Sequence, residues 1–176
     1  VYKRQVFDEK APYLSGRTPA KGEKDVYEEP AISGEGSLYE HCLKALRRAM
    51  RTGENGLPYM GTGDWNDGMD ELGAKGRGES VWLGWFLLSV ISEFLPVARL
   101  RKDSPAEKEL MQFAAGLREA VEKAWDGRWY LRAISDDGQK IGSSQSDECR
   151  IDVISQAWAV ISGMGDPLRQ RTAVGS

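Results

Sequence analysis

The feature that most constrains the fold is an apolar stretch at residues 79–101, because its large side chains point to every side of a helix. Its apolar residues are Val81, Trp82, Leu83, Trp85, Phe86, Leu87, Leu88, Val90, Ile91, Phe94 and Leu95. A helix that is hydrophobic on every face is buried on every face. A transmembrane helix needs an apolar run of about 20 residues, and Glu93 and Pro96 leave the uncharged run too short. We therefore predict a buried helix here, enclosed by other helices and without membrane contact.

Four further helices follow from capping signals and from apolar residues at helical spacing. Ser37 with Glu40 three residues later forms a capping-box pattern. Ser104 followed by Pro105 is typical of an N-cap with Pro at the first helical position. The expected helices lie at about residues 37–52, at 104–125, at 150–162 with Ile151, Ile154, Trp158 and Ile161 on its inner face, and from Asp166-Pro167 onward.

The remaining segments predict little regular structure. Residues 1–36 are polar and rich in Pro, Gly and Glu, which favours an extended segment and loops. The run 129–134 followed by Asp136-Asp-Gly138 predicts a short hairpin. No βαβ alternation is present, so a parallel sheet is disfavoured. We predict an all-α, double-layered helical barrel with a small β-hairpin. Only part of that barrel is expected within residues 1–176, which would belong to one domain of a longer chain.

Charge and residue types exclude several classes of protein. The formal net charge is -3 with no basic stripe, which excludes electrostatic capture of nucleic acid. His41 is the only histidine, so we expect no zinc site and no Ser-His or Cys-His nucleophile. Cys42 and Cys149 do not make a disulfide scaffold, and no signal peptide is visible. We therefore expect a reducing, cytoplasmic location.

The chemistry is expected in the long loop at residues 53–78, which contains eight glycines. Loops of this length are usually functional or disordered. Within it, Asp64-Trp65-Asn66-Asp67 places two carboxylates and an amide around one aromatic ring. A carboxylic acid with a raised pKa can protonate a departing glycosidic oxygen. Trp offers a flat face for a sugar ring, and Asn can bind hydroxyls, so these residue types suit carbohydrate chemistry.

The same residue types also occur in loops with other roles. Asp and Asn in a glycine-rich loop are commonly turn formers and helix caps. For a calcium loop, Asp64, Asn66 and Asp70 would occupy the first, third and seventh places, but Gly comes one place early and Lys75 replaces the final Glu. A phosphate-binding P-loop fails because no Gly-Lys-Ser/Thr follows the glycines. We therefore expect no bound metal and no cofactor.

A longer motif resembles glycoside hydrolase family 94. It comprises Gly56-Leu-Pro-Tyr-Met-Gly-Thr-Gly-Asp-Trp-Asn-Asp-Gly-Met69 and Gly76-Arg-Gly-Glu-Ser-Val-Trp-Leu-Gly-Trp-Phe86. That family holds cellobiose, cellodextrin and chitobiose phosphorylases and the phosphorylase-like domain of cyclic β-1,2-glucan synthases. The segments Trp125-Asp-Gly-Arg-Trp-Tyr130 and Asp147-Glu-Cys-Arg-Ile-Asp152 are most similar to the synthase branch.

The resemblance implies an (α/α)6 barrel and a role for each residue of the loop. Asp67 would be the general acid, and Trp65 would line the acceptor-side sugar subsite. Asp64 and Asn66 would shape the loop and contact sugar. Inorganic phosphate would be the co-substrate and a β-glucan or other oligosaccharide the partner. One carboxylate suffices in such enzymes, because phosphate attacks the anomeric carbon without a base.

An inverting hydrolase would instead need a second carboxylate about 6.5–9.5 Å away to activate water. Glu79, Asp70 and Asp147 are left open for that role. Glu79 and Ser80 are rather expected to cap the buried helix. The tract from Asp147 to Arg150 is expected to form a salt bridge where the next helix starts.

Two further segments of the family are not visible in this sequence. One contains Arg-Asp and holds the donor sugar, and the other contains His and Gly-Thr and binds phosphate. His41 does not belong to the phosphate segment and is expected to be a packed or surface residue. We therefore expect the catalytic-loop portion of an inverting β-glucan phosphorylase, acting on β-1,2-linked glucose and inactive in isolation. The rivals are an inverting hydrolase and a non-catalytic carbohydrate-binding helical module. A soluble or an inner-membrane parent, and its homodimerisation, stay open.

Overall fold

The computed structural model describes residues 4–20, 23, 26–61 and 63–176, except for the side chain of Asp67. The chain divides into two compact units, Val1–Arg47 and Arg48–Ser176. The boundary falls near the end of the first α-helix, so most of that helix belongs to the first unit.

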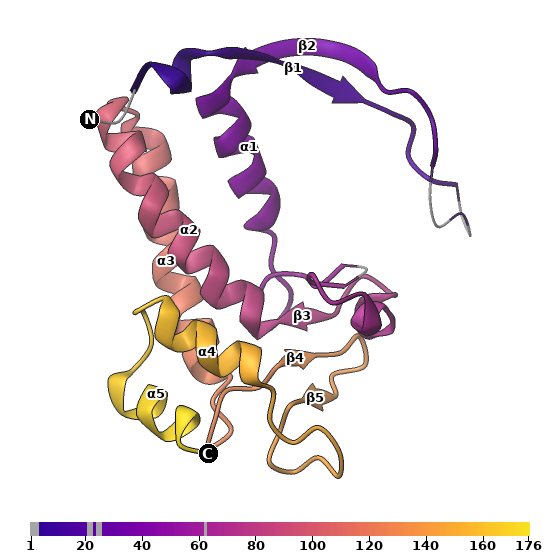
Figure 1. The fold of residues 1–176 in the computed structure, drawn as a ribbon, viewed down its shortest axis with the longest axis vertical. Helices are drawn as coiled ribbons and strands as arrows, with labels where there is room; N and C mark the ends of the chain where they lie inside the picture. Colours follow the sequence, from indigo (N-terminus) through magenta and orange to yellow (C-terminus); the bar gives the residue numbers. More distant parts are fainter. Residues whose placement is uncertain (1–3, 21–22, 24–25, 62) are drawn as a thin grey trace. The chain divides into compact units, whose positions relative to one another are not determined.

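The first unit contains a β-ribbon that the sequence did not predict. A 3-10 helix, η1 (Arg4–Asp8), precedes β1 (Lys10–Ser15), which pairs antiparallel with β2 (Ala31–Ser37). Figure 1 shows the two strands side by side. The extended backbone expected in residues 1–36 is present in these strands, but their pairing was not predicted. Their residues are mostly exposed, so the alternation of a half-buried strand is missing from the sequence.

Helix α1 (Leu38–Ala49) begins at the predicted capping box. The Ser37 backbone N–H donates to Glu40 Oε2 at 2.6 Å, and the Glu40 N–H donates to Ser37 Oγ at 3.3 Å. These bonds from the Ser37 backbone and hydroxyl lower the pKa of Glu40. The helix ends three residues before the predicted position 52, and the start of the prediction is confirmed.

His41, on α1, is a packed histidine, one of the two alternatives left open by the sequence. Its ring stacks on Tyr13 with a centroid distance of 4.1 Å, and its Nε2 lies 3.0 Å from the Ala11 carbonyl oxygen. Both partners belong to β1, so the histidine joins helix and ribbon within the first unit.

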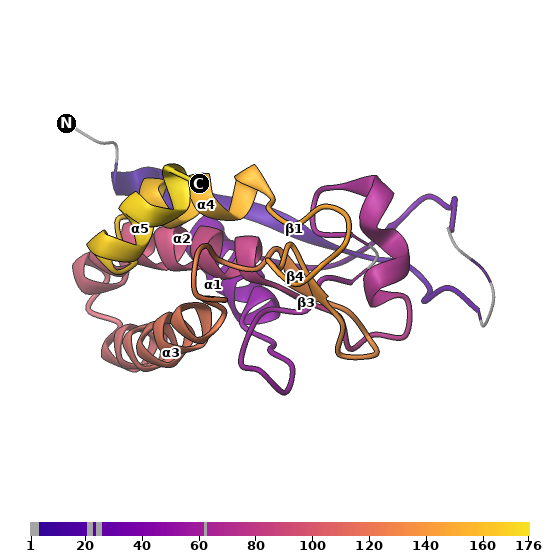
Figure 2. The same cartoon turned by 90° about the horizontal axis from the view of Figure 1, so that it is seen from below.

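The second unit is built around the apolar helix α2 (Val81–Leu100), which packs against α3 (Ser104–Lys123) and α4 (Val153–Ile161). Both views show α2 and α3 side by side (Figures 1 and 2). The predicted helices at 79–101 and 104–125 are confirmed. The N-cap of α3 is Asp103 rather than Ser104, because the Asp103 side chain accepts the Ala106 N–H at 3.1 Å.

Burial of α2 is less complete than predicted. Trp85 and Ile91 are fully buried, but Phe86 is 39% and Leu100 is 54% exposed within the described residues. By length and composition the helix could cross a membrane, contrary to the expectation that its apolar run is too short. Half of its most apolar window is buried inside the structure, and core helices of soluble proteins pass the same test.

Helix α4 buries a different face from the predicted one. Ile151 and Ile161 are 40% and 64% exposed, while Ser155, Gln156 and Ala159 are buried. The expected inner face is therefore wrong at Ile151 and Ile161, whereas Trp158 is half-buried and packs against the rings of Trp82 and Phe86 on α2. Helix α5 (Pro167–Val174) follows, with Asp166 as its N-cap as predicted.

A small sheet joins distant parts of the second unit. Its antiparallel strands follow the order β3 (Glu79–Ser80), β4 (Ala133–Ile134) and β5 (Lys140–Ile141). The predicted hairpin corresponds to β4 and β5, and β3 was not predicted. The described chain is thus mainly helical with two small antiparallel sheets. The helical barrel, and a single domain spanning both units, stay predictions.

Candidate active site

The first half of the glycine-rich loop, residues 53–60, is fastened to β3 by Glu79. This carboxylate is 2% exposed. Its Oε1 accepts hydrogen bonds from the Asn55 backbone N–H at 3.1 Å and the Asn55 Nδ2 at 2.8 Å. Its Oε2 accepts the Leu57 N–H at 3.0 Å. Glu79 therefore holds the loop, and the expectation that it caps α2 is wrong.

The cap of α2 is Ser80 alone. Its Oγ accepts the Leu83 N–H at 3.1 Å, and the same hydroxyl donates to Asp64 Oδ2. The start of α2 is thereby tied directly to the Asp-Trp-Asn-Asp segment.

Asp64 is anchored by a buried ion pair with Arg132. The Arg132 Nη1 lies 2.6 Å from Asp64 Oδ2 and its Nη2 lies 2.6 Å from Oδ1, a bidentate arrangement. Asp64 is 3% and Arg132 is 1% exposed. Asp64 is therefore anchored to a residue outside the loop, and its expected contact with sugar stays a prediction. Arg132 was missed, because nothing local in the sequence connects it to a residue 68 positions away.

Trp65 is turned outward from this anchor. Its side chain is 77% exposed, and its backbone φ is +94°, a region that side-chain-bearing residues avoid. Its ring lies 6.2 Å from that of Trp82, whose ring stacks on Phe86 at 5.7 Å. Residues held in such sparsely populated conformations are concentrated at functional sites. An exposed aromatic face next to the acidic segment fits the sugar platform proposed for Trp65.

Asn66 and Asp67 begin a 3-10 helix, η2 (Asp67–Gly73), inside a loop that was predicted to lack regular structure. Asn66 is its N-cap, and Asn66 Oδ1 accepts the Gly68 N–H at 3.1 Å. Asn66 thus fixes the start of η2, and its expected contact with sugar stays a prediction. The Asp67 side chain lies outside the described part of the structure, so its role as general acid also stays a prediction.

The end of the loop is fastened by Asp136, a second residue that sequence reasoning missed. Asp136 Oδ2 accepts the Lys75 N–H at 2.6 Å, and Oδ1 accepts those of Arg77 at 2.7 Å and Gly78 at 2.9 Å. Burial opposes ionisation, but these three backbone bonds outweigh it and lower the pKa of Asp136. Together with Glu79, this carboxylate fixes both ends of the loop.

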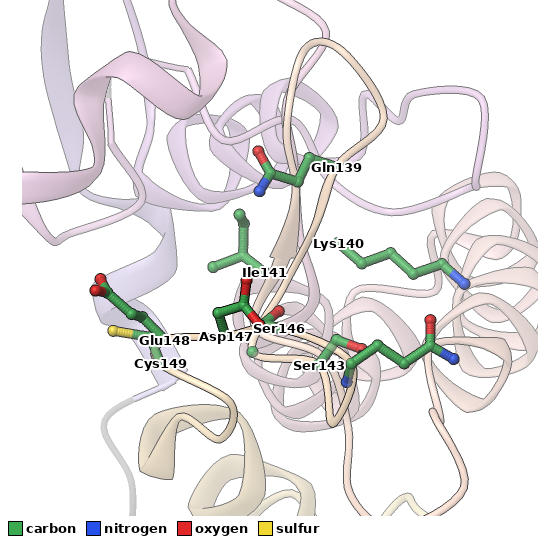
Figure 3. Close-up of a pocket in the computed structure, with 10 residues that line it drawn as sticks. Gln139, Lys140, Ile141, Ser143, Ser146, Asp147, Glu148 and Cys149 are labelled. Atoms are coloured by element: carbon green, nitrogen blue, oxygen red, sulfur yellow. The ribbon is translucent and has the colours of Figure 1, made fainter.

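An open pocket of about 820 Å³ lies along residues 139–149 (Figure 3). Asp147 lies in its lining and is exposed, so this carboxylate is accessible. Contrary to expectation, Arg150 makes no salt bridge with any residue that the structure describes, and its Nη2 donates to the Ser144 carbonyl at 2.7 Å. Asp152 caps α4 instead, by accepting the Ile154 N–H.

Cys42 and Cys149 are free, exposed thiols. Among the described residues, no group of three or more His, Cys, Asp or Glu side chains could hold a metal ion.

Residues 11–176 match the catalytic domain of the glycosyl hydrolase 94 superfamily. The chain belongs to this superfamily, which the loop motif had indicated. It is 45% identical over 172 residues to the cyclic beta-(1,2)-glucan synthase NdvB of Rhizobium meliloti (strain 1021), covering 96% of this chain and 6% of that protein.

Phosphorylases are also similar to this chain. Solabiose phosphorylase of Paenibacillus borealis is 40% identical over 136 residues, which is 76% of this chain and 18% of the relative. N,N'-diacetylchitobiose phosphorylase of Vibrio furnissii is 34% identical over 137 residues, which is 76% of this chain and 17% of the relative. The chain thus spans less than a fifth of the length of each of these relatives.

Proposed function

We propose that this chain carries the general-acid loop of an inverting β-glucan phosphorylase domain. In the proposed reaction, Asp67 donates its proton to the departing glycosidic oxygen as the bond to the anomeric carbon breaks. Inorganic phosphate attacks the same carbon from the opposite face and forms the new carbon–oxygen bond. The products are an α-glucosyl phosphate and a glucan shortened by one unit.

The observation that carries the proposal is the way the segment 64–67 is held. Asp64 is locked in a buried ion pair and Asn66 caps η2, so the backbone is fixed on both sides of the exposed Trp65. A fixed backbone that presents an aromatic face beside a carboxylate suits a sugar ring that must be aligned with an acid. The phosphorylase relatives support the same reaction class.

The substrate class rests on the similarity to a cyclic beta-(1,2)-glucan synthase, which favours β-1,2-linked glucose. The mainly helical second unit favours a helical barrel, completed by other parts of the same domain. The donor-sugar and phosphate sites would also lie there, so the isolated chain is proposed to be inactive. No cofactor, metal or nucleic acid enters this proposal, and we place the domain in the cytoplasm.

The test is Asp67→Asn in the complete protein. Loss of the general acid should lower kcat for a β-1,2-linked glucose disaccharide by about 10²–10⁴-fold. It should have a much smaller effect on an aryl β-glucoside, whose phenolate leaves without a proton. Glu71→Gln is the matched control, because Glu71 is an exposed carboxylate in the same η2.

The measurement is the release of glucose 1-phosphate with and without inorganic phosphate. Full activity of the Asp67→Asn enzyme would contradict the proposed acid and favour a non-catalytic carbohydrate-binding module. Release of free glucose without phosphate would favour the inverting hydrolase.

A further inference from the structure

The buried Arg132 contacts more of the candidate site than any sequence motif suggests. Its backbone N–H donates to the Ile141 carbonyl at 2.8 Å, and its carbonyl accepts the Val81 N–H at 3.2 Å. The residue is therefore fixed between β5 and the first turn of α2. Its guanidinium extends from this fixed point to Asp64.

The guanidinium joins three segments that are distant in sequence. It holds Asp64 through two bonds of 2.6 Å, and its Nη1 lies 3.3 Å from Ser80 Oγ, the cap of α2. Its Nε lies 3.6 Å from Asp152 Oδ2, the cap of α4, and has no hydrogen-bond partner among the described residues. The loop segment and the starts of two helices thus converge on one side chain.

Asp64 directly precedes a residue whose backbone conformation is energetically unfavourable by itself. Trp65 follows Asp64 directly and has a φ of +94° with a 77% exposed ring, so the few contacts of its side chain do not explain the strain. Such a conformation persists only when its surroundings determine it. The fixed neighbours are Asp64 on one side and the Asn66 cap on the other.

We propose that Arg132 is a positioning residue for the general-acid loop, because its ion pair with Asp64 holds Trp65 in its left-handed conformation and fixes where η2 begins at Asp67. This inference rests on the proposed function of Asp67. Arg132 is buried and acts through Asp64, so it is not expected to touch substrate. A displacement of about 1 Å at a catalytic group can lower a rate about 10²-fold.

The test must separate positioning from stability, since removing one partner leaves a buried charge and destabilises the fold. The double variant Asp64→Leu with Arg132→Met replaces both partners by apolar side chains of similar size, a change that is often neutral for stability. The buried Ser80 hydroxyl loses its acceptor Asp64 in this variant but still caps α2 through the Leu83 N–H. The control is Glu107→Leu with Arg99→Met, which removes a surface ion pair of 2.6 Å between α3 and α2. Both double variants are made in the complete protein.

Three quantities are measured in each variant: the unfolding midpoint, the hydrogen exchange of the loop and the turnover of two substrates. We expect the Asp64/Arg132 variant to unfold near the wild-type midpoint, while the Gly68 amide exchanges faster. Its kcat should fall about 10²-fold for a β-1,2-linked glucose disaccharide and much less for an aryl β-glucoside. The control pair should leave all three unchanged.

Wild-type kcat and wild-type exchange in a stably folded Asp64/Arg132 variant would overturn the proposal and reduce the pair to a structural role. An equal loss with both substrates would also overturn it, because a misplaced acid affects only the leaving group that needs a proton. Exchange at Gly68 reports the anchoring without reference to catalysis. Failure of the proposed function would instead show as an active Asp67→Asn enzyme.

Discussion

The two halves of the glycine-rich loop are both held by buried carboxylates, but in different ways. In residues 53–60, Glu79 accepts only neutral N–H groups, from Asn55 and Leu57. In residues 63–69, Asp64 is neutralised by the guanidinium of Arg132. The first half is folded back on β3, while the second half presents Trp65 to solvent.

The comparison of Glu79 with Asp64 shows two ways in which a buried carboxylate can hold a loop. A carboxylate that collects amide N–H groups fixes the backbone that supplies them, and Asp136 does the same for residues 75–78. A carboxylate paired with a cation is held through its side chain, so that the backbone beside it is anchored while the ring of the next residue, Trp65, extends into solvent. The segment with the exposed aromatic residue is held on either side of Trp65, by the ion pair of Asp64 and by the Asn66 cap.

The largest effect on the first half is expected from Glu79→Ala. The Leu57 N–H would lose its acceptor in a buried place, which is costly, and the exposed Asn55 would lose the acceptor that holds it to β3. We expect a loss of about 3 kcal/mol in the free energy of unfolding, measured by urea denaturation. Glu54→Ala, an exposed change in the same turn, should have little effect. Equal stabilities of the two variants would show that Glu79 does not hold the loop.

A smaller effect is expected at Asp136, which holds the end of the loop and whose contribution to stability depends on pH. The folded-state pKa of Asp136 lies below its ordinary value, so its contribution to stability is fully present above about pH 4. That contribution is lost as the pH falls through the lower folded pKa. The stability difference between wild type and Asp136→Asn should therefore be constant near neutrality and shrink below about pH 4. Unfolding midpoints across this range measure it.

The matched variant for this comparison is Asp137→Asn, because Asp137 is an exposed neighbour paired with Lys75 at the surface. Its stability difference from wild type should be smaller at neutral pH, since surface ion pairs contribute little. A difference for Asp136→Asn that grows as the pH falls would contradict the assigned direction of its pKa.

The smallest effect concerns the strain at Trp65. Trp65→Gly and Trp65→Ala both remove the ring, but only Gly adopts the φ of +94° without steric cost. Trp65→Gly should therefore be about 1 kcal/mol more stable than Trp65→Ala, as measured by urea denaturation. At Trp158, inside α4, the same pair of changes should have the opposite order, because Gly weakens a helix. The same order at both positions would argue against strain at Trp65.

Much of the helical structure could be predicted because its signals are local. The Ser37–Glu40 box and the Asp166 cap lie where the sequence indicates, and the α3 cap differs by one residue because Asp103 and Ser104 are both capping types. The buried face of α4 was not predictable from apolar residues. It is set by Gln156, whose amide bonds the Tyr130 backbone N–H and carbonyl.

The sequence predicted the residues of the candidate site but not the residues that hold the loop in place. The motif around Trp65 identifies the loop and its chemistry. The residues that hold it, Arg132 and Asp136, act across sequence separations of 68 and about 60 positions, where one sequence shows no periodicity or spacing to connect them. The strain at Trp65 likewise depends on tertiary contacts, because no local signal favours a left-handed tryptophan.

The sequence separation between Asp64 and Arg132 also determines how early their ion pair can form during protein synthesis. Synthesis proceeds at about 5–20 residues per second, so roughly 3–14 seconds separate the emergence of the two partners from the ribosome. Until then, Asp64 is an acid without its counter-ion and the turn at Trp65 has no anchor. We expect this loop to be among the last parts of the nascent second unit to reach its final conformation, after the local turns of α2 have formed.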